Sequence, residues 1–73
     1  MADVTAHITG TVWKIECKVG QQVNAGDTLV ILESMKMEIP VVATTAGVVH
    51  EIVCAEGRSL AAGDPVCVIR VES

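Results

Sequence analysis

The residues of this sequence with the clearest chemical potential stand near its centre, where Lys36 lies between Met35 and Met37. A lysine amine is nucleophilic only when deprotonated, and free lysine is almost fully protonated at neutral pH. The surrounding stretch, ESMKMEIP from Glu33 to Pro40, contains no set of groups that would build a catalytic pocket. We therefore expect Lys36 to be modified by another enzyme, and an ordinary solvated turn lysine is the alternative.

The two methionines place flexible apolar side chains beside that amine. Such surface is unfavourable in free solution, but it adapts well to the pocket of a partner protein. If this stretch is part of a strand, however, one methionine would simply point inward and the other outward. Both interpretations are open at this point.

Three cysteines and two histidines are the other candidates for chemistry: Cys17, Cys54, Cys67, His7 and His50. An odd number of cysteines without CxxC spacing indicates reduced, buried thiols rather than disulfides or a zinc site. A metal site that also uses the histidines is the alternative, and we expect none. The sequence offers no Ser/His/Asp, Cys/His or paired-carboxylate arrangement, so we expect a protein that is not itself an enzyme.

The length of 73 residues predicts one domain over residues 1–73. The composition is 51% hydrophobic with Trp13 as the single aromatic residue, so Val, Ile, Leu and Ala must fill the core. Val and Ile favour strands, and Gly and Pro recur at intervals that divide the chain into short pieces. This composition predicts an all-β sandwich or barrel.

The net charge of −4 disfavours nucleic acid or an anionic membrane as a partner. Neither a basic cluster nor stacking aromatic residues support binding to nucleic acid. No apolar run reaches transmembrane length, and the N-terminus lacks the layout of a signal peptide. We therefore expect a cytoplasmic protein.

The sequence contains an internal repeat, because a shift of 37 residues aligns it with itself without a gap. Ten of the 36 aligned pairs are identical, a fraction that the Val- and Ala-rich composition does not explain. The identical pairs include Gly10/Gly47, Cys17/Cys54, Gly20/Gly57 and the Ala-Gly-Asp triplets 25–27 and 62–64. Each half is too small to bury its own apolar face, so the repeat predicts two halves packed about a pseudo-twofold axis.

Each half is predicted to form four short strands, 4–8, 11–18, 22–24 and 28–33, followed by 37–43, 48–55, 59–61 and 65–71. The intervening turns are expected to hold Gly20, Gly26, Gly57 and Gly63 at positive φ. Alternation along the second strand predicts a core-facing set of Trp13, Ile15, Cys17 and Val19.

The repeat also predicts where the lysine lies. Lys36 aligns with Ser73, so the lysine turn and the chain termini become equivalent points at opposite ends of the domain. Two-residue hairpin turns need positive φ and usually contain Asn, Asp or Gly. If Met35 and Lys36 form such a turn, we expect a strained backbone that is retained because it presents Lys36.

These residues resemble the attachment motif of the biotinyl/lipoyl attachment domain family, whose centre is Met-Lys-Met after a small residue. The wider pattern also fits: Val19-Gly20, Ala25-Gly26-Asp27, Leu29, Glu33 to Met37, Gly47, Gly57 and Gly63-Asp64. The length is similar to that of free-standing attachment proteins of the biotin carboxyl carrier type. The resemblance implies a flattened β-barrel, or barrel-sandwich hybrid, of two four-stranded antiparallel sheets.

The resemblance further implies that Lys36 accepts biotin from a biotin protein ligase that uses biotinyl-adenylate. The ligase would read Met35, Met37 and Glu33. The modified lysine would form a swinging arm that carries carboxybiotin from a biotin carboxylase site to a carboxyltransferase site. On this interpretation the protein is a monomeric, non-catalytic carrier.

Two features depart from the family pattern. Ser34 stands where many members have alanine, and both residues are small. The segment 18–24 is too short for the protruding thumb of some acetyl-CoA carboxylase carriers, so we expect a generic carrier.

Two alternatives stay open from the sequence. A lipoyl carrier, or a domain that accepts both groups, would share the fold, although methionine on both sides of the lysine favours biotin. An interaction module without any prosthetic group is the second alternative, and it would have no need of Met-Lys-Met at the pivot of the repeat.

Overall fold

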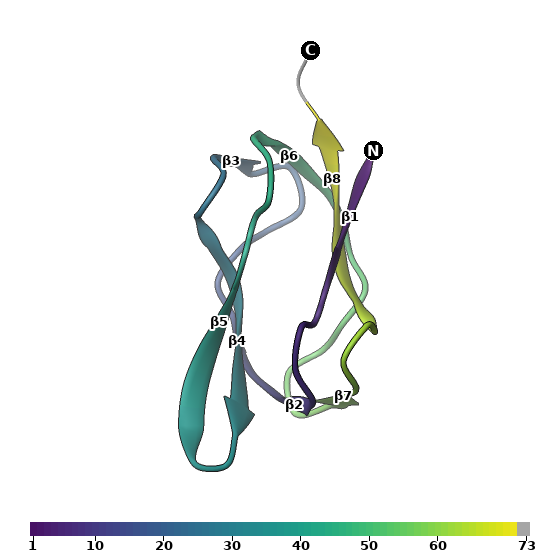
Figure 1. Ribbon diagram of the computed structural model, residues 1–73. Coiled ribbons are helices and arrows are strands. Elements are labelled where there is room, and N and C mark those ends of the chain that lie inside the picture. Colours follow the sequence, from purple (N-terminus) through teal and green to yellow (C-terminus); the bar gives the residue numbers. More distant parts are fainter. Residues whose placement is uncertain (72–73) are drawn as a thin grey trace.

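The computed structural model describes residues 1–71, which form eight strands and no helix (Figure 1). The strands are β1 (Ala2–Thr5), β2 (Gly10–Ile15), β3 (Gln22–Val23), β4 (Thr28–Ser34), β5 (Met37–Val42), β6 (Gly47–Ile52), β7 (Ser59–Leu60) and β8 (Pro65–Val71). All eight predicted strands are present. β1 begins two residues and ends three residues before its predicted range 4–8. β2 and β6 also end three residues earlier than predicted, at equivalent positions of the repeat.

The strands form two antiparallel sheets of four strands each, so the predicted fold class is confirmed. One sheet has the order β5-β4-β2-β7 and is called the hairpin sheet below. The other has the order β1-β8-β6-β3 and is called the terminal sheet. A shift by half of the chain converts each order into the other, which is the pseudo-twofold relation that the repeat predicts.

The two halves are interlocked by backbone hydrogen bonds that occur in equivalent pairs. The amide of Gly20 donates to the carbonyl of Val49 at 2.8 Å, and the amide of Gly57 donates to the carbonyl of Val12 at 2.8 Å. Likewise, the turn at Gly26 bonds to Ala43, and the equivalent turn in the second half bonds to the first half. Each turn therefore depends on a backbone segment from the opposite half.

The glycines of these turns have the predicted geometry. Gly20, Gly26, Gly57 and Gly63 have φ between 87° and 94°, a region that disfavours any residue with a Cβ atom. In two of the turns an aspartate completes the loop, since a side-chain oxygen of Asp27 accepts a bond from the Asn24 amide at 2.8 Å. Asp64 makes the equivalent bond in the second half.

The core lies between the sheets and consists of small aliphatic residues and two cysteines. Its buried members are Val4, Ala6, Val12, Cys17, Val23, Leu29, Val30, Leu32, Val41, Ala43, Val49, Val66, Cys67 and Ile69. Both halves contribute, and no polar or charged residue among the described ones is buried. Packing of aliphatic, mostly β-branched side chains from two short sheets thus fills a core that contains no aromatic residue.

The predicted core face of the second strand is partly wrong. Ile15 and Cys17 do pack inward, but Trp13 is 49% exposed and Val19 is 64% exposed. A β-bulge between Val12 and Lys14 makes Trp13 an extra residue, so the inward position before the bulge belongs to Val12. Val19 lies beyond the strand, in the turn that contains Gly20.

The molecule is elongated, with extents of 38 × 18 × 18 Å. The turn between β4 and β5 forms one end, and the N-terminus and the end of β8 lie at the other (Figure 1). The predicted location of Lys36, far from the termini, is therefore confirmed. Its aligned partner Ser73 lies outside the described residues.

Candidate functional site

The lysine hairpin, composed of β4, β5 and the turn between them, is the most prominent projection of the molecule (Figure 1). Its two strands pair over six positions, the last of which joins Ser34 to Met37. Only Met35 and Lys36 remain between these partners. The lysine thus occupies the second position of a two-residue turn.

Both turn residues have positive φ, 53° for Met35 and 64° for Lys36. These are the only non-glycine residues with positive φ among those described, so the positive φ predicted for a two-residue turn is confirmed. Positive φ at both positions is typical of a type I′ turn, whose twist matches that of the paired strands. The turn has this geometry without the asparagine or glycine that normally makes it favourable.

The side chains of the turn are open to solvent. Met35 is 91% exposed and Met37 is 63% exposed, so neither methionine fills the core. The possibility that one methionine points inward for packing is therefore not supported. Lys36 is also exposed, and its amine stands beside an apolar surface that a partner can cover.

Two glutamates flank this turn on neighbouring strands. Glu33 of β4 and Glu38 of β5 are directly paired in the register, one position below Ser34 and Met37. Both are exposed, and no ion pair to either glutamate is present among the described residues. Like charges opposite one another weaken a sheet slightly, so this pair lowers the stability of the hairpin. It also places two negative charges close to the lysine turn.

The base of the hairpin is anchored in the core. Leu29, Val30 and Leu32 of β4 are completely buried, and they hold the strand from which the turn projects. On the other side, Gly10 begins β2 so close to β4 that an added Cβ would lie 2.8 Å from the carbonyl oxygen of Glu33. The strand that leads into the lysine turn is thus held by the packed core and by close contact with β2, although the turn itself is exposed.

The three cysteines are free thiols in or beside the core. Burial raises the pKa of Cys67 to about 12, with a further contribution from Cys17 and Cys54 nearby. Burial also raises the pKa values of Cys17 and Cys54. All three are therefore protonated at neutral pH and are poor nucleophiles.

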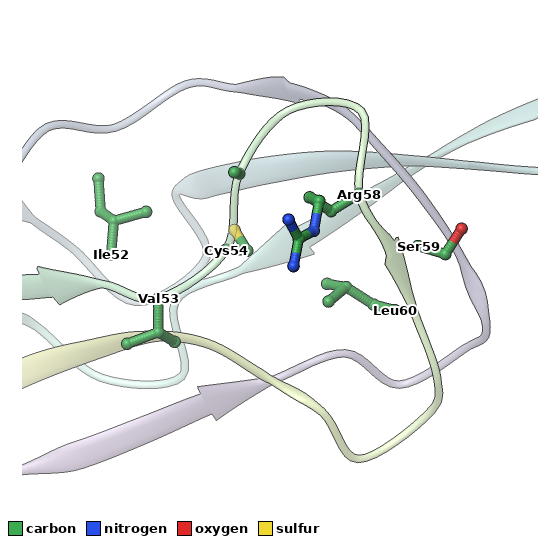
Figure 2. A pocket seen from close by; sticks show the side chains of 7 residues that line it. Ile52, Val53, Cys54, Arg58, Ser59 and Leu60 are labelled. Atoms are coloured by element: carbon green, nitrogen blue, oxygen red, sulfur yellow. The ribbon is translucent and has the colours of Figure 1, made fainter.

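A hollow of about 360 Å³ lies beside the end of β6 and β7 (Figure 2). It is lined by Ile52, Val53, Cys54, Ala55, Arg58, Ser59 and Leu60. The lining has neither a carboxylate nor a histidine that could activate Ser59 or Cys54. The hollow therefore lacks the groups of a catalytic site.

The described residues contain neither a cluster of metal ligands nor a membrane-spanning helix. No group of three or more His, Cys, Asp or Glu side chains in residues 1–71 is arranged to hold a metal ion. Within the same residues there is no helix that is long and apolar enough to span a membrane.

The sequence reasoning missed one surface feature, the exposed Trp13. Simple alternation along the strand predicts a core position for this single aromatic residue. The internal alignment contained a signal, since Trp13 aligns with the polar residue His50. Equivalent positions in two similar halves usually have the same burial.

Known proteins match this chain in both sequence and fold. Residues 1–69 match the family described as biotin-requiring enzyme. The biotin/lipoyl attachment protein of Bacillus subtilis is 50% identical over 40 residues, which is 55% of each chain. The biotinylated protein TB7.3 homolog of Mycolicibacterium smegmatis is 56% identical over 41 residues, 56% of this chain and 58% of the relative.

These sequence matches thus span little more than half the length of the curated relatives. A solved structure extends the similarity to nearly the whole fold. The urea carboxylase of Kluyveromyces lactis superimposes with a TM-score of 0.90 and 40% identity over 94% of this chain. The match covers 6% of that enzyme.

Proposed function

Because this chain belongs to the biotin/lipoyl family of biotin-requiring enzymes, we propose that it is a covalent biotin carrier whose attachment residue is Lys36. The single observation that carries the proposal is the turn. Lys36 projects from a strained two-residue turn at the end of the molecule opposite the termini. Retaining this strain at an exposed position suits presentation of the amine better than it suits stability.

The residues around Lys36 fit attachment of biotin through an amide. Nζ of Lys36 would attack the carboxyl carbon of biotinyl-adenylate, and AMP would leave as the amide forms. Within residues 1–71 no carboxylate forms an ion pair with this amine, so we propose that the ligase removes its proton. When bound, biotin would supply the ureido group that accepts and releases a carboxyl group.

The ligase would recognise the hairpin from its end. Met35 and Met37 offer apolar surface on both sides of the amine, and Glu33 adds a negative charge one strand position below. We therefore assign Met35, Met37 and Glu33 to ligase recognition. The domain is proposed to act as a cytoplasmic monomer over residues 1–73, and to perform no catalysis itself.

The carrier would serve a biotin-dependent carboxylase. The similar solved fold is a part of urea carboxylase, and this similarity supports a carboxylase as the partner. The proposed partner would contribute a biotin carboxylase site and a carboxyltransferase site. Lys36 is exposed in the turn at one end of the molecule, so an arm attached there would be free to move between two such sites. Amide formation would also remove the positive charge of the lysine.

An intact-mass measurement tests this proposal. The protein would be co-expressed with a biotin ligase and biotin, beside the variant Lys36→Arg. We expect the mass of one biotin less one water on the wild type, and no addition on the variant. The other lysines, Lys14 and Lys18, remain in both proteins and serve as internal controls.

Addition to the variant would show that another residue is the acceptor. If a folded wild type gains no biotin, the same measurement with a lipoate ligase decides whether the hairpin accepts lipoate. The absence of both groups would leave the interaction module as the remaining interpretation.

A further inference from the structure

The outer surface of the hairpin sheet has an apolar area that attachment to Lys36 does not use. It comprises Trp13 of β2, Ile31 of β4, and Pro40 and Val42 of β5, and is called the Trp13 patch below. Trp13 and Val42 are 49% and 39% exposed, Pro40 is exposed and Ile31 is half-buried.

The register brings these residues together. Ile31 is paired with Pro40 on one side and with Lys14 on the other, and Trp13 is the bulge residue next to Lys14. Val42 lies two positions beyond Pro40, so both side chains emerge on the same face of β5. The four residues thus come from three adjacent strands of one sheet.

The fold does not require this patch, because the second half of the repeat provides an internal comparison. The terminal sheet has Asp3, Val68 and Glu51 in the same register, with a bulge at His50. Its residues equivalent to Trp13, Pro40 and Val42 are His50, Asp3 and Thr5. The same strand geometry therefore accepts polar residues at three of the four positions.

The charges beside the patch are predominantly negative. The paired Glu33 and Glu38 lie between the patch and the lysine turn. The nearest positive charge, on Lys14, is 3.7 Å from a carboxylate oxygen of Glu16 and is thereby offset. A protein that covers this face gains most if its surface is apolar in the centre and basic on the side toward the turn.

A second copy of this chain fits the face poorly. A twofold dimer would use the same surface on both subunits, so it would bring a second pair of glutamates to one interface. The patch is also built from only four residues, far fewer than the roughly 20–30 per side of a stable interface. These features favour a transient contact with a different protein.

We propose that the Trp13 patch is the surface through which this domain docks on the carboxylase subunits that use it. The partner surface would present apolar residues edged by arginine or lysine. This inference rests on the proposed carrier function. Lys36 lies five positions after Ile31, at most about 17 Å along the chain, so docking there would leave the lysine turn uncovered.

The test exchanges the patch for its counterpart in the other half of the repeat. The variant Trp13→His/Pro40→Asp/Val42→Thr is compared with wild type, both biotinylated and checked by intact mass. The control variant His50→Ala/Thr5→Ala alters two positions on the outer face of the terminal sheet. Circular dichroism and urea unfolding confirm that both variants fold.

The probes are the biotin carboxylase and carboxyltransferase subunits encoded by the same genome, purified without a carrier domain. We expect the exchange to raise the Kd for at least one subunit by about tenfold or more, whereas the control stays within about twofold of wild type. The rate at which the ligase adds biotin should be unchanged by the exchange. Added salt should weaken binding of the wild type.

Trp13 also supplies a direct reporter, since it is the only tryptophan of the chain. Incorporation of 5-fluorotryptophan gives a single ¹⁹F resonance from the centre of the patch. We expect this resonance of the wild type to shift when the subunit that it binds is added. The variant Pro40→Asp/Val42→Thr retains the reporter, and its resonance should shift only at higher subunit concentrations.

Four results would overturn the docking proposal. The first two are that wild type binds neither subunit, or that the exchange leaves the Kd unchanged. The third is that the ¹⁹F resonance shifts when the concentration of the domain alone is raised. The fourth is that the exchange slows biotin addition by the ligase but leaves subunit binding unchanged. The last result would assign the face to the ligase. Failure of the carrier function itself is recognised earlier, because the wild type would then show no biotin in its intact mass.

Discussion

At the scale of single residues, the lysine turn depends on a backbone conformation that its side chains disfavour. Positive φ costs a residue with a Cβ atom about 1–2 kcal/mol, and both Met35 and Lys36 have it. The cost is sustained because six paired positions of β4 and β5 leave only two residues to reverse the chain. The strain therefore comes from the hairpin register, whereas the proposed recognition by the ligase would depend on the side chains.

Met35→Asn should separate these two effects. Asparagine tolerates positive φ, so we expect the free energy of unfolding in urea to rise by about 0.5–1 kcal/mol. Loss of the exposed methionine should at the same time slow biotin addition by the ligase. Unfolding of the apo protein and initial rates of biotin addition measure the two quantities.

Met37→Asn is the matched control for that variant. Met37 lies in β5 and has no positive φ, so asparagine should bring no gain in stability there. Equal stabilisation by the two substitutions, or destabilisation by Met35→Asn, would contradict the strained-turn interpretation.

At the scale of the elements, glycine at the start of β2 and β6 allows neighbouring strands to approach closely. An added Cβ at Gly10 would lie 2.8 Å from the carbonyl oxygen of Glu33. At Gly47 it would overlap the carbonyl oxygen of Arg70 and a methyl group of Ile69. The conformational freedom of glycine is not needed at these two positions, since neither has positive φ. Glycine is needed at these positions because the neighbouring strand leaves no space for a Cβ atom.

Gly47→Ala should therefore destabilise the protein more than Gly57→Ala. The new methyl group at position 47 meets backbone that cannot move freely, and we expect a loss of about 2–4 kcal/mol or failure to fold. At position 57 the surrounding space is open, and only the positive φ of 87° opposes alanine, which costs about 1–2 kcal/mol. Urea unfolding of both variants measures the difference, and a larger loss at Gly57 would show that close approach is not the controlling factor.

At the scale of the whole molecule, the two halves support one another. Turns of the first half bond to strands of the second half, and the reverse bonds are present at equivalent positions. The core also takes residues from both halves. Neither half therefore has a complete set of hydrogen-bond partners or a closed core by itself.

This interdependence predicts a single cooperative unfolding transition. Trp13 reports on the first half through its fluorescence, and Cys67 reports on the second half through alkylation of its thiol at neutral pH, located by peptide mass mapping. Cys67 is fully buried and its pKa is raised to about 12 by burial, so it should react only after unfolding. We expect the two probes to have the same urea midpoint, and two separated midpoints would show that the halves unfold independently.

The features that the sequence by itself determined are those with a local or periodic origin. The 37-residue repeat predicts the pseudo-twofold relation, and the paired glycines locate the turns. A turn of two residues between long strands requires positive φ whatever surrounds it, so the strain at Met35 and Lys36 was predictable. The family resemblance rests on the same local motif.

Other features were decided only by the tertiary structure, because they depend on which strands pair and in what register. The bulge at Trp13 arises where β2 adjusts to β4, and it turns a residue that alternation assigns to the core toward solvent. The register likewise places Glu33 against Glu38 and joins Trp13, Ile31 and Pro40 on one face. A periodic sequence pattern cannot show such a shift, because one extra residue in a strand reverses the faces on either side of it.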